Sequence, residues 1–211
     1  MDASDSGLCA IDISLESYVT YAFTPSEVTL INEFKSGVKN GFDINYRELL
    51  SYAFAIHSWG SKWRLLHPQR INHVHFRIDN TSAVARQNKM AFRNPRAQVL
   101  IRLMALWEND FGLRFSSSHI AGSANVRADL GSRIAGCPQR LQEFTDLSRE
   151  WLQVEHNLDS QSFVEMWEQV FASSQLPAPV CPSTSRHSST GTPGRFATDF
   201  NPGPLQAPVP R

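Results

Sequence analysis

The apolar residues of this chain change their spacing several times, and that alternation limits the folds the chain can adopt. Residues 74–78 alternate between apolar and polar side chains, which is typical of a strand with one buried face. Apolar, β-branched and aromatic residues predict further strands at residues 8–13, 17–23, 28–34 and 113–120. Stripes at helical spacing predict helices at residues 45–64, 81–89, 95–112, 124–134, 138–158 and 162–171. This order predicts an α/β fold, in which helices cover a mixed sheet, and excludes an up-down helical bundle.

Several polar residues stand where helices are expected to begin. Asn45 is followed three residues later by Glu48, a pair that predicts a capping box. Ser162 and Glu165 repeat the same spacing before the last predicted helix, and Ser123 is a candidate cap for the helix at 124–134. For Glu48, the capping role is one of two interpretations, because a second use of its carboxylate is considered below.

The composition changes abruptly after residue 175. Eight of the chain's 12 prolines lie in residues 175–211, among Ser, Thr and Gly, so we predict a disordered tail there. The amphipathic helices of residues 136–174 are expected to pack on the core, with partner binding as the alternative. Residues 1–135 are then predicted to form the main domain.

Charge is segregated although the formal net charge is zero. Residues 57–96 carry eight Lys and Arg residues but one acid, Asp79, whereas residues 143–168 carry seven acids and only Arg149. The basic residues are Lys62, Arg64, Arg70, Arg77, Arg86, Lys89, Arg93 and Arg96. A basic block with aromatic and histidine neighbours suits a polyanion such as nucleic acid. A solvated face that balances the acidic segment is the alternative.

Composition removes several classes of protein. Hydrophobic residues make up 41% of the chain, which is enough for a core, yet no apolar run approaches the ~20 residues of a membrane span. The first residues lack the basic and apolar regions of a secretory signal. The three cysteines, Cys9, Cys137 and Cys181, are odd in number and widely spaced, which favours a reducing intracellular setting (cytoplasm or nucleus) over a disulfide framework.

Four acids stand at the ends of predicted elements: Asp2, Glu48, Asp79 and Asp129. Carboxylates gathered from separate elements are what Mg²⁺ binding needs, since this ion prefers oxygen ligands and retains waters. Two such ions about 4 Å apart can activate a water and stabilise the leaving oxygen of a phosphodiester. Each acid also has a plainer interpretation as a helix cap, a solvated residue or part of a frayed terminus.

The residues around these acids form four short motifs in a fixed order. They are Asp2-Ala3-Ser4 with Gly7, then residues 44–50 (INYRELL), residues 78–84 (IDNTSAV), and residues 119–133 (HIAGSANVRADLGSR). Together they resemble the ribonuclease H domain of retrotransposon reverse transcriptases, most closely that of DIRS-type elements. The last motif is similar to the family's H-x-x-G-x-x-N-x-x-A-D-x-x-S-R ending, with Gly131 where a hydrophobic or other small residue often stands. The resemblance covers about residues 2–134.

The resemblance implies a five-stranded mixed sheet flanked by helices and a Mg²⁺-dependent endonuclease that cuts the RNA strand of RNA–DNA hybrids, with Mn²⁺ as a substitute. It implies that Asp2, Glu48, Asp79 and Asp129 bind two ions and that His119 assists proton transfer or product release. A hydrogen-bonded residue at a strand end is the alternative for His119. The residues expected to contact nucleic acid are Asn80, Ser82, Arg47, Lys62, Arg64, Arg86 and Lys89. For Asn80 and Ser82, a role as a helix cap is an equally good alternative.

In that family the first acid lies within a central strand, preceded by apolar residues, whereas here only Met1 precedes Asp2. We therefore expect a truncated first strand and an upstream polymerase domain that is missing from this chain. A fragment without activity, or a non-catalytic module of the same fold that binds nucleic acid or protein, is the alternative hypothesis. A third hypothesis is a related integrase or transposase nuclease of the same fold. Residues 45–48 and 119–129 fit the ribonuclease better than this third class.

Overall fold

The computed structural model describes residues 1–66, 69–90 and 92–173, so the predicted tail of residues 175–211 lies outside the described residues. The strands are β1 (Asp2–Ala3), β2 (Gly7–Asp12), β3 (Ser17–Ala22), β4 (Asn72–Ile78), β5 (Leu113–His119) and β6 (Leu152–Gln153). The helices are α1 (Pro25–Lys35), α2 (Ile44–Leu66), α3 (Thr81–Asn88), α4 (Pro95–Phe111), α5 (Val126–Ser132), α6 (Pro138–Leu147) and α7 (Ser160–Ser173). In the described part of the chain, no helix is both long and apolar enough to cross a membrane.

The strands form two hydrogen-bonded sheets. One has the order β1-β2-β3-β6, with β2 antiparallel to β1 and β3, and β6 parallel to β3. The other pairs β4 and β5 in parallel. The α/β class and the mixed sheet are confirmed, but the expected five-stranded sheet is divided between these two. Within the described residues, the two sheets are joined by the hydrogen bond that the Met1 amino group donates to the Arg77 carbonyl oxygen at 3.2 Å.

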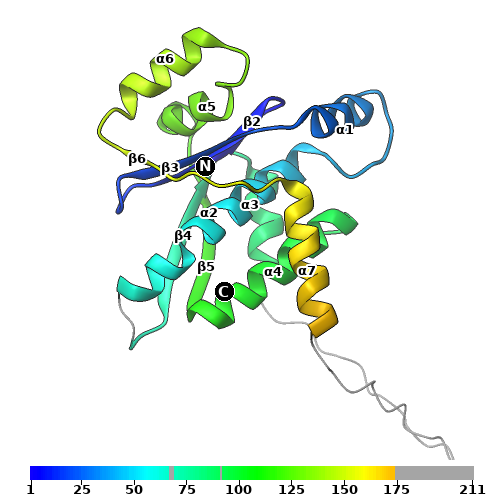
Figure 1. Ribbon diagram of the computed structural model, residues 1–211, viewed down its shortest axis with the longest axis vertical. Helices are drawn as coiled ribbons and strands as arrows, with labels where there is room; N and C mark the ends of the chain where they lie inside the picture. The colour runs from blue at the N-terminus through cyan, green and yellow to red at the C-terminus, as the bar shows by residue number, and fades with distance from the viewer. Residues whose placement is uncertain (67–68, 91, 174–211) are drawn as a thin grey trace, which may run out of the picture. The chain divides into compact units, whose positions relative to one another are not determined.

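Helices cover both faces of the strands. Helices α5 and α6 lie on one face of β2 and β3, and α2 lies on the other (Figure 1). Helix α4 packs on α2, and α7 packs on α4. The long helix α2 is buried along most of its length, which places its residues at the centre of the core.

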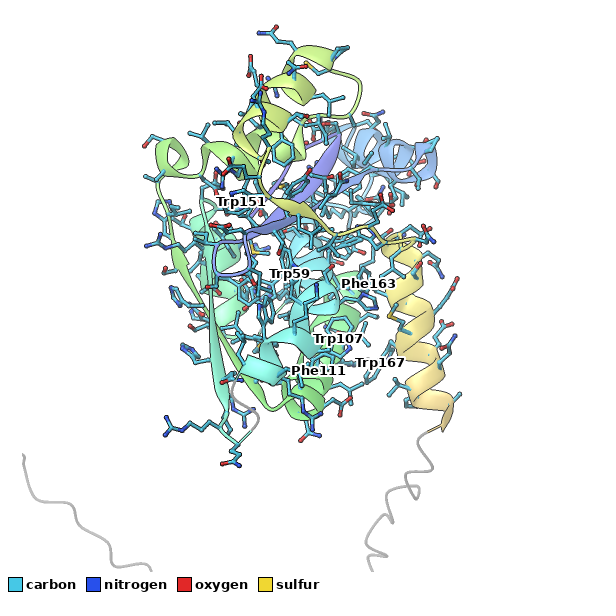
Figure 2. All side chains as sticks on the ribbon, turned by 60° about the vertical axis from the view of Figure 1, so that its left-hand side comes forward. Trp59, Trp107, Phe111, Trp151, Phe163 and Trp167 are labelled. Carbon is cyan, nitrogen blue, oxygen red and sulfur yellow. The ribbon has the colours of Figure 1, made fainter. Side chains whose placement is uncertain are left out.

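The C-terminal helices belong to the same compact unit as the rest of residues 1–173. The Phe163 side chain of α7 is fully buried, and its ring centroid lies 6.1 Å from that of Trp107 on α4 (Figure 2). Phe144 of α6 is buried too, edge-on to Tyr18 of β3. The expectation that this region packs on the core is therefore confirmed.

The predicted helix at residues 138–158 is wrong beyond Leu147. After α6 the chain becomes extended and crosses to the outer edge of β3, where Val154 N donates to Tyr18 O at 2.8 Å. The apolar residues that predicted a longer helix make two different sets of contacts. Trp151 lies against Arg127, and Val154 packs on the core. Tertiary contacts here outweigh local periodicity.

The predicted strand at residues 28–34 is also wrong, because this segment lies inside helix α1. Thr24 caps the helix, with Thr24 Oγ1 accepting from Glu27 N and the Glu27 carboxylate accepting from Thr24 N. Pro25 follows at the first helical position, which favours a helix start. The β-branched residues favoured a strand, but the capping box decides the structure.

Two capping boxes expected from the sequence are wrong. Helix α2 begins one residue earlier than Asn45, and Asp43 Oδ1 accepts from Tyr46 N at 2.9 Å. At α7 the cap is Asp159, whose Oδ1 accepts from Ser162 N at 2.8 Å. Glu48 is therefore released from a capping role.

Gly131 fixes how closely α5 approaches the sheet. A Cβ built there would lie 2.5 Å from Cys9 Sγ and 2.8 Å from Phe144 Cε2. We expect Gly131→Ala to lower the free energy of unfolding by about 1–3 kcal/mol, since overpacking outweighs the helix propensity gained by alanine. Urea unfolding measures this, with Gly122→Ala as the control because its nearest atom lies 3.9 Å away. A Gly131→Ala protein as stable as wild type would contradict this packing.

Candidate metal centre

Three of the four predicted acids meet in one place. A carboxylate oxygen from each of Asp2, Glu48 and Asp79 lies within 4.8 Å of the other two. Asp2 and Glu48 are buried, and Asp79 is half-buried. Side chains that are 46 and 31 residues apart in the sequence thus form one cluster, which we call the acidic triad.

Three different elements bring the triad together. Asp2 lies on β1, which the Met1–Arg77 hydrogen bond joins to β4. Asp79 follows the last residue of β4 directly, so it lies beside β1 at the end of that strand. Glu48 lies in α2, the buried helix that packs against both β1 and β2. The site therefore depends on the correct juxtaposition of the two sheets.

Burial and mutual repulsion disfavour the charged forms of the Asp2 and Glu48 carboxylates. Burial raises the pKa of Asp2 to about 6, and the nearby charges of Asp79 and Asp129 add to the shift. Burial also raises the pKa of Glu48 to about 8, with further contributions from Asp2 and Asp79. Burial lowers the pKa of the adjacent Met1 ammonium, against the attraction of these acids. Like charges in a low-dielectric site repel one another unless a proton or a cation is present.

Two polar residues hold the triad in position. Ser132 Oγ donates to Asp2 Oδ2, and this hydrogen bond opposes the rise in the Asp2 pKa. The Asn125 side-chain amide donates to Met1 O at 3.1 Å and to Asp79 Oδ2 at 3.4 Å. Both residues come from the last of the four sequence motifs. Partners of this kind orient ligands and tune their basicity.

The donor set fits a hard divalent cation. All three candidate ligands are carboxylates, and Mg²⁺ is bound in proteins through a few carboxylates together with waters. Glu48 Oε2 is buried without a hydrogen-bond partner among the described residues, and such an oxygen is normally satisfied. A cation in the triad would satisfy this oxygen and relieve the repulsion. The triad therefore could hold a metal ion, as the sequence predicted in general terms.

The two other predicted catalytic residues lie outside the triad. The Asp129 carboxylate forms an ion pair with Arg133, with 2.8 Å between Oδ1 and Nε. Its negative charge contributes to the raised pKa of Asp2. His119 is exposed at the end of β5, opposite Ile78 in the parallel register. Neither places a ligand atom among those of the triad. The structure thus brings together three predicted metal ligands, with the fourth acid nearby.

The predicted nucleic-acid residues divide into two groups. Lys62 and Arg64 on α2, and Ser82, Arg86 and Lys89 on or next to α3, are exposed.

Two others make structural contacts instead. Asn80 caps α3, since its Oδ1 accepts from Ser82 N at 3.0 Å. Arg47 is buried, with its guanidinium donating to Ser4 O and, at 2.8 Å, to Asp5 Oδ1. Its predicted contact with nucleic acid is therefore not supported, and Arg47 instead anchors the turn after β1.

Sequence reasoning assigned no role to Ser132, Asn125 or the Met1 amine. Both Asn125 and Ser132 belong to the last of the four motifs, on either side of Asp129. Their place in that motif is the feature of the sequence that could have indicated a role near the metal ligands. Their contacts to Asp2 and Asp79 need the packing of α5 against β1, which spacing alone does not predict.

We expect Ser132→Ala to weaken Mg²⁺ affinity by about 10–100-fold, since loss of an outer hydrogen bond to a metal ligand has effects of this size. Loss of the donor also raises the pKa of Asp2 further, so the loss should be larger at pH 6 than at pH 8. Isothermal titration with MgCl₂ measures this, with Ser123→Ala in the exposed 3-10 turn (Gly122–Ala124) before α5 as the control. Equal affinities for Ser132→Ala and wild type at both pH values would contradict this role.

Comparison with protein-family models, with curated proteins and with solved structures finds no match for this chain.

Proposed function

We propose that the chain is a metal-dependent nuclease of the ribonuclease H type, which hydrolyses the RNA strand of RNA–DNA hybrids within a retroelement reverse transcriptase. The observation that carries the proposal is the acidic triad, because three carboxylates from separate elements meet within 4.8 Å. Those three residues are the ones that the family resemblance assigns to metal binding.

The arrangement of strands supports the same class of fold. An antiparallel β1-β2-β3 unit and a parallel β4-β5 unit meet where Met1 donates to Arg77. If the two sheets continue each other at this point, the strand order β3-β2-β1-β4-β5 would match the five-stranded mixed sheet that the resemblance implies, and helices lie on both faces of the strands (Figure 1). Asp2 and Asp79 then stand at the junction, as the proposed fold requires.

In the proposed reaction, Asp2, Glu48 and Asp79 are the residues that would hold divalent ions. Ions bound there would supply Lewis acidity for the attack of water on a phosphodiester. Ser132 and Asn125 keep the Asp2 and Asp79 carboxylates in place through their hydrogen bonds. Asp79 is half-buried, so a substrate phosphate would reach the triad from the side of this residue.

The exposed cations of α2 and α3 supply the nucleic-acid contacts in this proposal. Lys62, Arg64, Arg86 and Lys89 are exposed and belong to the basic block of the sequence. Phosphate contacts provide most of the affinity and make it sensitive to salt. Selection of a hybrid over duplex DNA requires contacts to 2′-hydroxyl groups in the minor groove.

The test is cleavage of an end-labelled RNA–DNA hybrid with MgCl₂ or with EDTA. We expect internal cuts in the RNA strand that depend on Mg²⁺ or Mn²⁺ and leave 3′-hydroxyl ends, while duplex DNA of the same sequence stays intact. Asp79→Asn purified in parallel identifies any contaminating nuclease. Equal degradation by wild type and Asp79→Asn would remove the nuclease proposal.

A non-catalytic binding module of the same fold is the second candidate. The observation that favours it is the ion pair of Asp129 with Arg133, because it engages the fourth acid, which lies near the triad but is not part of it. Hybrid binding of equal strength in MgCl₂ and EDTA, without cleavage, would favour this module over the nuclease.

A further inference from the structure

The two-stranded sheet of β4 and β5 has a covered face and an open face. Helices α2, α3 and α4 are the helices that pack closely on these strands (Figure 1). On the covered side, the ring of Tyr52 from α2 stacks on that of Phe76, with 3.7 Å between the ring centroids. Because side chains alternate along a strand, the odd-numbered residues of β4 face away from these helices.

The open face is polar and basic. It consists of three cross-strand pairs in the parallel register: His73 with Arg114, His75 with Ser116, and Arg77 with Ser118. The four histidine and arginine side chains are exposed, and the two serines are half-buried. We call these six residues the basic sheet face. None of the six is an acid, so the two guanidinium charges are not offset within the face.

Hydrogen bonds order the centre of the basic sheet face. His75 Nδ1 lies 2.8 Å from Ser116 Oγ, and His75 Nε2 lies 2.7 Å from Ser118 Oγ, so the imidazole reaches across from β4 to β5. A protonated ring donates through both nitrogens, which leaves both hydroxyl protons free to donate to an oxygen outside the protein. The ring of His73 follows along β4, with its centroid 6.4 Å from that of His75. The centre of the face is thus a set of donors that suits an anion.

The two guanidinium groups have donors available to a ligand. The ion pairs within the described residues do not involve Arg77 or Arg114. Arg114 Nη1 donates to Leu113 O at 2.9 Å, which uses one of the five donors of that side chain. Arginine and serine side chains are among the groups that most often contact the phosphates of nucleic acids. The composition of the face is therefore complementary to a phosphate backbone.

The dimensions of the basic sheet face favour a single strand of nucleic acid over a duplex. Paired β-strands lie about 4.8 Å apart, so the face is a narrow track that fits one backbone. Residues on the same face of a strand repeat about every 6.6 Å, close to the spacing of successive phosphates in an extended nucleic-acid strand. Imidazole and guanidinium planes also stack on unpaired bases, which a duplex does not expose.

We propose that the basic sheet face binds single-stranded nucleic acid, with phosphates at Arg77, Arg114 and the two serine hydroxyls and an unpaired base against the imidazole of His73. The face is formed by β4 and β5 alone. It is distinct from the cations of α2 and α3 discussed above, since those helices pack on the opposite side of the strands. The inference does not rest on the metal centre or on the proposed nuclease activity.

The test is fluorescence anisotropy of fluorescein-labelled oligouridine RNA and oligothymidine DNA, each of about 12 nucleotides, titrated with the full chain. EDTA in the buffer keeps binding separate from any metal-dependent cleavage. We expect at least one single strand to bind with a Kd between about 1 and 100 µM at physiological salt, and more weakly as salt rises. No saturation by either strand up to about 1 mM protein, or a DNA duplex of the same length bound as tightly, would overturn the proposal.

The double variant Arg77→Gln/Arg114→Gln assigns the binding to the basic sheet face. Its matched control is Lys39→Gln/Arg140→Gln, which removes two exposed cations from the loop between α1 and α2 and from α6. We expect the first variant to weaken single-strand binding about tenfold, while the control stays near wild type. The slope of log K against log salt should also fall by about 1.4 in the first variant, because each phosphate contact of a single strand contributes about 0.7. Equal effects in the two double variants would reduce the binding to net charge and overturn the proposal.

The variant His73→Ala tests the same face through stacking rather than charge. The His73 side chain is exposed, so this single change leaves the core intact and stands in if the double variant does not fold. We expect it to weaken single-strand binding by at least about fivefold, the effect of losing one stacked base. Wild-type affinity in His73→Ala would overturn the proposed placement of the strand.

Discussion

Asp79→Asn is expected to abolish the Mg²⁺-dependent cleavage of an RNA–DNA hybrid, with a loss of more than about a hundredfold in rate. Replacement of an outer partner of a metal ligand already reduces affinity or activity by about 10–100-fold, and Asp79 is a proposed ligand itself. Asparagine keeps the volume of the side chain but removes its charge, so the remaining carboxylates of Asp2 and Glu48 bind a cation more weakly. Single-turnover cleavage of a labelled hybrid measures the effect.

The matched control is Asp110→Asn, the same chemical change on the exposed end of α4. We expect this variant to cleave at the wild-type rate. Raised MgCl₂ should partly restore an Asp79→Asn protein whose defect is metal affinity. If the cleavage rate fell by a similar factor in both variants, the activity would not depend specifically on the triad.

Glu48→Gln is expected to stabilise the metal-free protein at alkaline pH. The pKa of Glu48 is about 8 in the folded protein against its usual 4.5, so the native state retains a proton that the unfolded state releases. The free energy of unfolding therefore falls as pH rises from 4.5 to about 8, and glutamine removes this fall. We expect Glu48→Gln to be as stable as wild type at pH 4 and more stable by at least about 2 kcal/mol at pH 9.

Urea unfolding in EDTA at several pH values measures the difference between Glu48→Gln and wild type. The lowered pKa of the Met1 amine has the opposite sign, and it largely cancels in this difference. MgCl₂ should raise the stability of wild type at pH 8 but that of Glu48→Gln much less, because a ligand stabilises only the state that binds it. Glu168→Gln, an exposed change on α7, is the control. A pH-independent difference would contradict the buried state of Glu48.

The sequence predicted the order of most elements because their signals are local. The alternation of residues 74–78 identified β4, and the stripes before Trp63 and Trp107 identified α2 and α4. Where two local signals competed, as at residues 28–34, the capping box of Thr24 and Glu27 decided for a helix. The stripe that ended at Leu158 failed for another reason, since its second half is held by contacts with β3 and Arg127.

The composition of the candidate site was predicted, but its geometry was not. Motifs identified Asp2, Glu48 and Asp79 as candidate ligands, and the structure brings these three together. The ion pair of Asp129 and the burial of Arg47 depend on how helices pack, which no spacing specifies. The division of the strands into two sheets also depends on long-range pairing. Local sequence carries little information of that kind.

The segment between α6 and α7 protects an edge of the sheet from association with other molecules. At the outer edge of β3, Leu152 N donates to Glu16 O and Val154 N donates to Tyr18 O, so backbone groups that another molecule would seek are already engaged. Open sheet edges are where folded proteins begin to form fibrous or amorphous aggregates. Cutting the chain between α6 and α7 should therefore expose this edge of β3 and increase the light scattered by a concentrated solution.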